Sequence, residues 1–342
     1  MRSVLVTGGA GFIGSAFIHH LLANHDYNVI NLDKLTYAGN LENLTAVEDD
    51  PRYRFIRGDI CDAKLVRSVM ADADAVVSFA AESHVDRSLE DPGAFIQTDV
   101  YGTFVLLEAA RQADLARFLH VSTDEVYGQS LGEQRFSEDD PFRPRSPYAA
   151  SKAGGELQCR VFVETYGMPV IVARPANNVG PRQYPEKAVP LFITNALEDQ
   201  PLPVYGQGLQ VRDRLYVEDH CEALDLLLHR GEVGEAYNIG AGNERSNIEV
   251  AQTILEMLDK PKSLIHFVED RPGHDQRYAL DSRKIQALGW LPRHDFTATL
   301  EKTVEWYRRN RRWWEKVKSG EYREYYQRMY GQRLADARPY QD

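Results

Sequence analysis

Short apolar runs alternate with helix-like stretches along the first half of the chain. Segments 16–22 and 94–111 repeat apolar residues at helical intervals, and the run at 75–79 is apolar throughout, as in a parallel strand buried on both faces. The strand-like runs lie at residues 3–7, 27–32, 54–57, 75–79 and 118–122. Strands separated by helices predict an α/β fold with a doubly wound parallel sheet.

The second half of the chain continues this pattern and then interrupts it. Residues 169–173 form a sixth strand-like run, but the stretch after Arg174 is rich in Pro, Asn, Arg and Tyr, as in loops over a site. Segment 217–230 has helical spacing again, and 237–240 is another strand-like run. Two interleaved domains are therefore predicted, a larger one at residues 1–176 plus about 213–238 and a smaller mixed α/β one at about 177–212 plus 239–342.

Bulk composition excludes several classes of protein. The 342 residues include 40 basic and 51 acidic side chains, and the net charge of -11 argues against nonspecific binding to nucleic acid or anionic membranes. No apolar run approaches the roughly 20 residues of a membrane-spanning helix, and no signal-peptide pattern precedes the first strand-like run. We therefore expect a soluble, cytoplasmic protein.

Neither the cysteines nor the C-terminal region changes this expectation. Cys61, Cys159 and Cys221 lie far apart without CxxC spacing, so we expect neither a disulfide framework nor a metal site. Segment 306–330 is basic and aromatic, which can indicate nucleic-acid binding. Its acidic residues are interspersed and its aromatic residues recur at helical spacing, so an amphipathic helix packed on its own domain is the preferred interpretation.

A glycine-rich loop follows the first strand-like run. Gly8, Gly11 and Gly14 allow a tight turn, close approach of a pyrophosphate and packing of the next helix. Asp33 follows the second run, where a carboxylate can accept hydrogen bonds from the adenosine ribose and repel a 2′-phosphate. Together these features predict a Rossmann-type sheet that binds NAD rather than NADP. A plain strand-to-helix turn, with Asp33 only capping the next turn, is the alternative.

Small and polar residues follow the later strand-like runs. Asp59 follows the third, where it could meet the adenine edge, and Ala80 and Ala81 follow the fourth, where small side chains leave room for a cofactor. His84 comes next and is either a site residue or a satisfied polar residue in a loop. Because ligands lie beyond the carboxyl ends of parallel strands, we expect a site at this edge of the sheet.

Two adjacent carboxylates, Asp124 and Glu125, follow the fifth run directly after Ser122 and Thr123. Loop solvation or capping would explain such a pair. The functional interpretation is an acid and a base whose environments separate their pKa values.

Tyr148 and Lys152 lie four residues apart in a predicted helix that begins with Ser146 and Pro147. They therefore project from one helix face, where an ammonium lowers the pKa of a nearby phenol and makes it a usable base near neutral pH. After a fifth parallel strand of a dinucleotide-binding fold, this Tyr-x-x-x-Lys pair resembles the mark of the short-chain dehydrogenase/reductase superfamily.

A narrower resemblance covers nearly the whole chain. Its segments read, in order, GGAGFIGSAF, KLTYAGN, GDICD, AAESHVDRSL, HVSTDEVYG, SPYAASKAG, NNVGPRQYPEKAVP, PVYGQGLQVRD, YVEDH, YNIGAG and DRPGHDQRYALD. They resemble the dTDP-glucose 4,6-dehydratase family. Nucleotide-sugar C4-epimerases are similar in the glycine loop and the Tyr/Lys pair but have no matching acid pair. The chain departs from the dehydratase pattern at Val179, Arg214 and Gly154-Gly155, so UDP-glucose or another nucleotide hexose stays open as the substrate.

The resemblance implies an NAD-dependent lyase that oxidises a nucleotide sugar at C4, eliminates water across C5 and C6, and returns a hydride to C6. Thr123, Tyr148 and Lys152 would serve the oxidation, Glu125 would remove the C5 proton, and Asp124, protonated, would donate to the departing oxygen. NAD would stay tightly bound and be regenerated in each turnover. A place in deoxysugar biosynthesis and a homodimer through two helices of the first domain are implied in the same way.

The resemblance also implies two sets of binding residues. Those for NAD are Gly8, Gly11, Phe12, Ile13, Gly14, Asp33, Lys34, Leu35, Thr36, Asp59, Ile60, Ala80, Ala81, Ser83, Thr98, Tyr148, Lys152 and Asn178. Those for the nucleotide sugar are His84, Thr123, Asn177, Lys187, Ala188, Pro203, Val204, Tyr205, Arg212, Asn247, Asp270, Arg271 and His274. Basic members of the second set could bind a diphosphate, although each alone is more often a solvated charge.

Two other functions stay open at this point. One is an epimerase or simple oxidoreductase of the same fold, whose product keeps its C6 oxygen. The other is a catalytically silent dinucleotide-binding protein, which the presence of both the Tyr/Lys pair and the acid pair disfavours.

Overall fold

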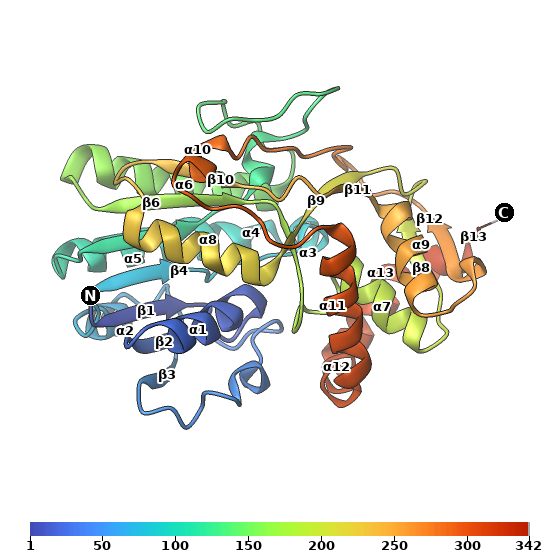
Figure 1. The fold of residues 1–342 in the computed structure, drawn as a ribbon, viewed down its shortest axis with the longest axis horizontal. Coiled ribbons are helices and arrows are strands. Elements are labelled where there is room, and N and C mark those ends of the chain that lie inside the picture. Colours follow the sequence, from blue (N-terminus) through green and yellow to red (C-terminus); the bar gives the residue numbers. More distant parts are fainter. Residues whose placement is uncertain (341–342) are drawn as a thin grey trace.

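A computed structural model describes residues 1–340 of the chain. Its larger part is a seven-stranded parallel sheet with the strand order β10-β6-β5-β4-β1-β2-β3 (Figure 1). The strands are β1 (Ser3–Thr7), β2 (Asn28–Asp33), β3 (Tyr53–Arg57), β4 (Ala75–Ser78), β5 (Arg117–Val121), β6 (Val170–Pro175) and β10 (Ala236–Ile239). The chain winds outward from β1 in both directions, which confirms the predicted doubly wound sheet.

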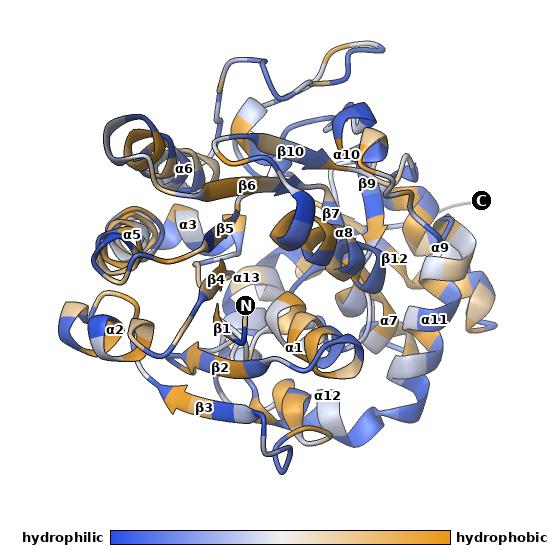
Figure 2. Ribbon diagram, turned by 60° about the vertical axis from the view of Figure 1, so that its left-hand side comes forward, coloured by the Kyte–Doolittle hydropathy of each residue, from blue (hydrophilic) through white to orange (hydrophobic). Residues whose placement is uncertain are grey.

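Helices cover both faces of this sheet (Figure 2). One face carries α1 (Phe12–Asn24) and α8 (Val217–Arg230), and the other carries α2 (Ala63–Met70), α5 (Thr103–Gln112) and α6 (Pro147–Tyr166). Because side chains alternate along a strand, Val4 and Val6 enter the core under α1 and α8, whereas Leu5 enters the core on the other face. Figure 2 shows β4 and β6 as hydrophobic along most of their length, as expected of strands buried on both sides.

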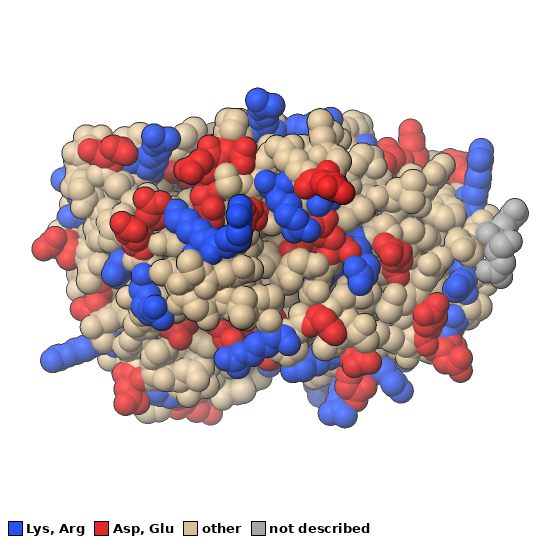
Figure 3. Space-filling model, turned by 45° about the horizontal axis from the view of Figure 1, so that its top comes forward, with Lys and Arg blue, Asp and Glu red and all other residues tan. Residues whose placement is uncertain are grey.

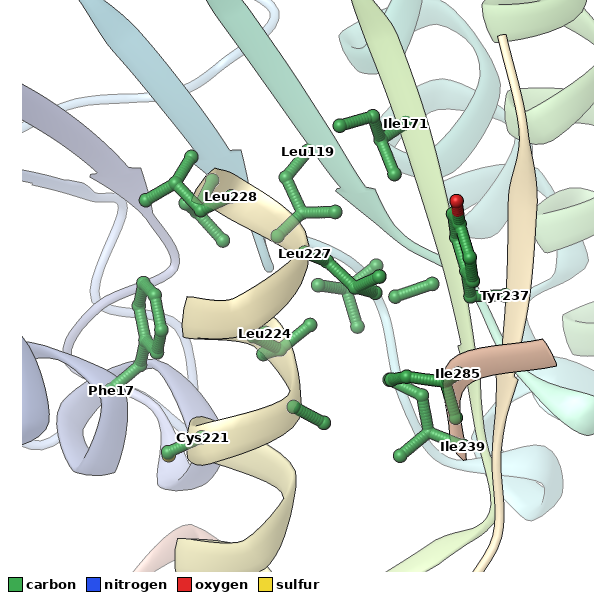
Figure 4. Close-up of a cluster of buried hydrophobic side chains, with 14 of the residues drawn as sticks. Phe17, Leu119, Ile171, Cys221, Leu224, Leu227, Leu228, Tyr237, Ile239 and Ile285 are labelled. Atoms are coloured by element: carbon green, nitrogen blue, oxygen red, sulfur yellow. The ribbon is translucent and has the colours of Figure 1, made fainter. Parts of the chain in front are cut away.

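Helix α8 supplies a large share of the first core. Leu224, Leu227 and Leu228 face the sheet and contact the region of Leu119 and Ile171 (Figure 4). Ile285 of the short helix α10 (Arg283–Ala287) joins the same cluster, together with Leu280 and Trp290. The segment around residues 280–290 therefore packs on the large sheet, whereas the predicted boundary assigned it to the smaller domain.

The smaller part of the molecule contains two three-stranded sheets, β11-β9-β7 and β13-β12-β8. Their strands are β7 (Asn177–Val179), β8 (Leu202–Tyr205), β9 (Val211–Tyr216), β11 (Glu244–Ser246), β12 (Ile265–Val268) and β13 (Arg338–Pro339). Helices α7 (Ala188–Leu197), α9 (Asn247–Met257), α11 (Phe296–Arg309), α12 (Arg311–Val317) and α13 (Glu321–Ala335) surround them. Val179, Leu202, Val250 and Leu300 lie in their common core.

The aromatic C-terminal region packs on this smaller part. It forms α11, α12 and α13 in succession rather than one long helix, and Tyr307, Trp314 and Tyr330 are buried in the smaller core. The aromatic residues thus serve packing, as the sequence predicted.

The remaining helical elements are short. They are α3 (Val85–Glu90), α4 (Pro92–Phe95), a π-helical turn (Ile96–Gly102) and the 3₁₀ turns at Leu41–Leu44, Asp124–Tyr127 and Lys262–Leu264. Figure 3 shows basic and acidic side chains interspersed over the face that it presents, without a broad patch of one sign. No helix within residues 1–340 combines the length and hydrophobicity that a membrane crossing requires.

Candidate active site

A cavity of about 300 Å³ opens at the carboxyl ends of the parallel strands. Its lining includes residues that directly follow or end six strands, from Gly8 after β1 to Ala176 after β6. This is the edge where open α/β sheets bind their ligands.

The glycine loop at the end of β1 leaves no room for side chains. Gly8 has a φ of 71°, and a Cβ atom there would lie 2.7 Å from the backbone nitrogen of Ala80. A Cβ atom on Gly14 would lie 2.3 Å from the carbonyl oxygen of Gly8. Helix α1 begins at Phe12 inside this loop, so its free N–H groups face the cavity, and the loop fits the pyrophosphate of a dinucleotide.

Replacing Gly14 with Ala is expected to lower NAD affinity at least about tenfold, because the methyl group must push the loop apart. The measurement is the NAD content of the purified variant and its titration with NAD. Gly93→Ala is the matched control, since a Cβ atom there makes only an ordinary 3.5 Å contact. If the Gly14→Ala variant binds NAD as tightly as the unsubstituted protein, the glycine loop is not the pyrophosphate-binding site.

Asp33 at the end of β2 organises the adenosine end of the cavity. Its Oδ1 accepts from the backbone N–H of Leu35 at 2.7 Å, and its Oδ2 accepts from that of Ala10 at 2.9 Å. Burial raises the pKa of this carboxyl, although the two backbone hydrogen bonds oppose the shift. Each oxygen keeps a second lone pair, so Asp33 both holds the turn and can accept from a ribose hydroxyl.

The structure brings the predicted NAD-binding residues together around this cavity with one exception. Leu35 does not line the cavity; its φ of 58° turns the chain so that its backbone serves Asp33 instead. Lys34 pairs with Asp59 at 2.7 Å across the entrance formed by β2 and β3. Glu82, Gln183 and Tyr184 also line the cavity and were not predicted. All three lie in segments that carry the resemblance, Glu82 between the predicted Ala81 and Ser83, and Gln183 and Tyr184 between the predicted Asn178 and Lys187.

The catalytic candidates meet at the inner end of the same cavity. Thr123, Glu125, Tyr148 and Lys152 line it, and all four come from the end of β5 or the start of α6. Ser146 caps α6 by accepting from the backbone N–H of Ala149 at 3.1 Å, which fixes the helix register. The Thr123 hydroxyl lies between the two acids, donating to Asp124 at 3.2 Å and accepting from the Glu125 N–H at 3.3 Å.

Asp124 is buried behind the cavity wall. Its side chain does not line the cavity, and its Oδ2 has no hydrogen-bond partner among residues 1–340. Burial, reinforced by the charge of Glu125, raises the pKa of Asp124 to about 8, and Arg212 only partly opposes this. Asp124 is therefore protonated at neutral pH.

The pair Tyr148 and Lys152 differs from the expectation. Burial and the charges of Glu125 and Asp99 hold the pKa of Tyr148 well above its ordinary value. Lys152 donates to the carbonyl oxygen of Val121 at 2.7 Å, and burial lowers the pKa of its ammonium. The protein alone thus keeps the phenol protonated, because burial and nearby carboxylates disfavour the phenolate.

Asp99 is a buried carboxylate that the sequence did not reveal. It accepts from the Ser151 hydroxyl at 2.6 Å and from the backbone N–H of Glu82 at 2.9 Å. Burial raises its pKa to about 6, while the charge of Lys152 opposes the shift. Asp99 partly neutralises Lys152 and joins α6 to the loop after β4. It lies in an apolar helical stretch of the sequence, which gave no sign of this role.

A second cavity of about 160 Å³ adjoins the first on the side of the smaller sheets. Glu125, Asn177, Asn178 and Lys187 line both cavities, so the two meet at Glu125. The other predicted substrate residues that line it are His84, Ala188, Pro203, Tyr205, Arg212, Asn247, Arg271 and His274.

Three predicted substrate residues, Thr123, Val204 and Asp270, do not line the second cavity, and Thr123 lines the first instead. Val204 is the inward member of the alternation in β8 and lies in the smaller core. Asp270 instead positions others, accepting from Gln210 at 2.8 Å and bonding the ring Nδ1 of His274 at 2.6 Å. Residues that the prediction missed here include Asp86, Glu186, Arg214 and Tyr330.

The second cavity is lined by several cations, and three of them, Lys187, Arg212 and Arg214, form no ion pair among residues 1–340; Lys187 donates to the carbonyl oxygen of Ser83. Arg271 pairs with Asp86 at 3.0 Å. Arg212 donates to the Asp275 carbonyl at 2.8 Å and Arg214 to the Asn247 side chain at 2.7 Å. Burial, with the charge of Arg212, lowers the pKa of Arg214 to about 9. A buried cation without a carboxylate favours an anionic ligand.

A glycine loop, an acidic β2 end and a Tyr/Lys pair beside one cavity define an extended short-chain dehydrogenase/reductase. The family model described as GDP-mannose 4,6 dehydratase matches residues 5–303. The chain belongs to the dTDP-glucose 4,6-dehydratase family. It is 52% identical to the dTDP-glucose 4,6-dehydratase of Neisseria meningitidis serogroup B, over 94% of this chain and 98% of that protein. It is 53% identical to the low-salt glycan biosynthesis protein Agl12 of Haloferax volcanii, over 89% and 98%.

A solved structure shares both fold and sequence. The crystal structure of DesIV, a dTDP-glucose 4,6-dehydratase from Streptomyces venezuelae with NAD and TYD bound, superposes with a TM-score of 0.91 at 49% identity, covering 93% of this chain and 100% of that one. The resemblance inferred from sequence segments is confirmed.

Proposed function

We propose that this protein is an NAD-dependent dTDP-glucose 4,6-dehydratase, which converts dTDP-glucose to dTDP-4-keto-6-deoxyglucose. The observation that carries the proposal is the acid pair beside the junction of the two cavities, where Glu125 lines both and Asp124 lies directly behind the wall. Asp124 stays protonated at neutral pH, and Glu125 lines both the NAD cavity and the substrate cavity. Oxidation at C4 alone requires neither residue, whereas elimination of water requires an acid and a base.

The chain's own residues divide the proton transfers. Tyr148 takes the O4 proton as a phenolate, which the positive charge of bound NAD⁺ would favour, and Thr123 and Lys152 line the same cavity. Glu125 removes the proton from C5, which the C4 ketone has acidified. Asp124, whose Oδ2 is buried without a partner behind the cavity wall, would turn into the cavity to give its proton to the departing C6 oxygen. Because the two cavities meet at Glu125, a hexose at this junction would lie between the nicotinamide of NAD in the first cavity and the nucleotide in the second.

The first cavity fits NAD through its glycine loop, the N-terminus of α1 and Asp33. When bound, NAD⁺ supplies a positively charged ring that accepts a hydride from C4 and, once reduced, returns a hydride to C6. Gln183, Tyr184 and Lys187 of the loop after β7 also line this cavity, which supports retention of the cofactor through the cycle.

The second cavity is proposed to hold the nucleoside diphosphate. Arg212, Arg214 and Arg271 offer guanidinium groups for phosphate oxygens, and Tyr205 offers an aromatic face for a pyrimidine. The domain that contains β7, β8 and α7 would thus bind the substrate, and the large sheet would bind NAD.

Replacing Arg214 with Gln is expected to raise the KM for the nucleotide sugar about 10- to 100-fold with a much smaller change in kcat. The reason is that Arg214 contacts the ground state and transition state alike if it holds the diphosphate. Steady-state kinetics and inhibition by the free nucleoside diphosphate measure the effect. Arg293→Gln is the control, because Arg293 is exposed and pairs with Glu222 at 3.0 Å. An unchanged KM would remove Arg214 from the substrate site.

The function is tested by incubating the protein, without added cofactor, with dTDP-glucose, UDP-glucose and GDP-mannose in parallel. A product lighter by one water from dTDP-glucose supports the proposal. A product of unchanged mass with inverted C4 would identify an epimerase, and water loss from another sugar would change the substrate. If none of the three nucleotide sugars is converted, the protein would be a dinucleotide-binding protein without this activity.

A homodimer is also proposed, formed through the face of α5 and α6. Tyr101, Phe104, Leu157 and Val161 have 41% to 50% exposed side chains there, although all four are hydrophobic. An apolar face of this kind is typical of a subunit interface. Val161→Glu is expected to yield monomers in light scattering, whereas Leu131→Glu, at an exposed site outside this face, should not. A monomeric unsubstituted protein would contradict the proposal.

A further inference from the structure

Three side chains capable of binding a metal meet near the amino ends of the large sheet's strands, at the edge opposite the two cavities. His20 lies near the end of α1, His25 directly follows that helix, and Asp225 lies in α8. Helices α1 and α8 lie side by side on one face of the sheet (Figure 1). β2 starts at Asn28, so the cluster lies at the amino ends of the strands.

The distances suit a small divalent ion. The Nε2 atom of His20 lies 3.2 Å from Oδ2 of Asp225, and the Nε2 atom of His25 lies 2.9 Å from Oδ1. Ligand atoms bound tetrahedrally at about 2.0–2.2 Å from zinc are about 3.3 Å apart. One atom from each of the three residues lies within 4.8 Å of the other two. Small shifts of the rings would therefore complete three coordination positions.

Surrounding residues hold these ligands in place. His229, one turn after Asp225, donates from Nδ1 to the Asp225 carbonyl oxygen at 2.8 Å and accepts at Nε2 from the Tyr27 hydroxyl at 2.7 Å. The ring of His25 stacks on Tyr27 at 4.8 Å and on His229 at 5.1 Å. Such outer contacts orient ligands in metal sites. Since both nitrogens of His229 are occupied, His229 is a supporting residue and not a ligand.

We propose that His20, His25 and Asp225 form a binding site for a zinc-like divalent metal ion that joins the end of α1 to α8. Two imidazoles and one carboxylate favour zinc, cobalt or nickel over magnesium or calcium, which prefer oxygen ligands. The three side chains are 17% to 24% exposed, so water can fill the remaining position. The site lies far from Glu125 and Tyr148 along the strands, so its role is structural.

The proton balance needs no external partner. Each ring binds the metal through Nε2 and carries its proton on Nδ1, and the Asp225 carboxylate, 3.2 Å and 2.9 Å from the two Nε2 atoms, provides the anion.

The test uses the full-length protein with its bound NAD, stripped of adventitious metal by a chelator. Zinc is titrated in competition with a chromophoric chelator, and cobalt is followed by its visible absorption. We expect one equivalent per chain, binding in the micromolar range or tighter, and a rise in Tm with zinc. Asp225→Asn and His20→Ala should each weaken binding at least tenfold, whereas His266→Gln, at a histidine outside the cluster, should not.

Dehydratase activity is expected to be the same with and without zinc. Binding weaker than about 100 µM by the unsubstituted protein would overturn the proposal, as would tight binding that survives both Asp225→Asn and His20→Ala. The titration of the unsubstituted protein stands even if a variant fails to fold.

Discussion

Replacing Glu125 with Gln should leave oxidation at C4 intact and stop the elimination. The amide keeps the shape of the side chain at the junction of the cavities but cannot remove the C5 proton. We expect turnover to fall about 10²- to 10⁴-fold, the range for loss of a general base. Addition of dTDP-glucose should then produce the absorbance of NADH, which persists because the hydride has no alkene to return to.

Tyr148→Phe is the matched comparison, because it removes one oxygen from a residue that lines the same cavity. It should suppress NADH formation itself, since no group takes the O4 proton. Tyr278→Phe provides a control for disturbance around Glu125, because the Tyr278 hydroxyl donates to Asp275 at 2.8 Å and only weakly approaches Glu125 at 3.4 Å. Normal dehydration by the Glu125→Gln variant would contradict the role of Glu125 as the C5 base. NADH formation by the Tyr148→Phe variant would contradict the role of Tyr148 as the O4 base.

Sequence reasoning reached the fold because its signals are local. A buried parallel strand is apolar on both faces, and a loop that touches a pyrophosphate needs glycine, so β1, β4 and the Gly8–Gly14 loop can be read from adjacent residues. Tyr148 and Lys152 were found for the same reason, since helical geometry relates positions four apart.

Contacts between distant segments gave no such signal. Asp99 reaches Lys152 and Ser151 across the interface of α6 with the π-helical turn, and Tyr330 reaches the second cavity from α13. The raised pKa of Tyr148 depends on burial and on carboxylates from several elements, so the spacing of Tyr148 and Lys152 predicted the opposite direction. The position of Val204 could not be predicted either, because it depends on which side chains of β8 alternate toward the smaller core, and Val204 is one of them.

Replacing Asp124 with Asn should abolish the alkaline decline of activity while it lowers activity at every pH. The acid must be protonated to donate to the C6 oxygen, and the pKa of Asp124 is about 8. In the unsubstituted protein, kcat should therefore fall with rising pH above about 8, up to tenfold per pH unit. The variant has no such group and should show a flat, low profile there. Measuring kcat for water loss from pH 6 to 10 tests this.

The same substitution should stabilise the fold, and the effect should grow with pH. The pKa of Asp124 rises from 3.8 to about 8 on folding, so the unfolded chain binds fewer protons than the native one between these values. Stability attributable to this group is then intact below about pH 4 and is lost as pH rises towards 8. We expect Asp124→Asn to unfold with a free energy about 1–3 kcal/mol higher at pH 8, and with a smaller difference at pH 5.

Denaturant unfolding of both proteins at pH 5, 6.5 and 8 measures that difference, and Asp140→Asn, at a carboxylate outside the site, is its control. A constant difference across pH would mean that Asp124 is ionised in the native state and cannot be the acid. If the difference in unfolding free energy widens with pH and elimination is lost, the same buried carboxyl of Asp124 both lowers the stability of the fold and donates the proton for the departure of water. A destabilising carboxyl of this kind is retained only where the reaction needs it, because the protein with an asparagine side chain at this position would be more stable.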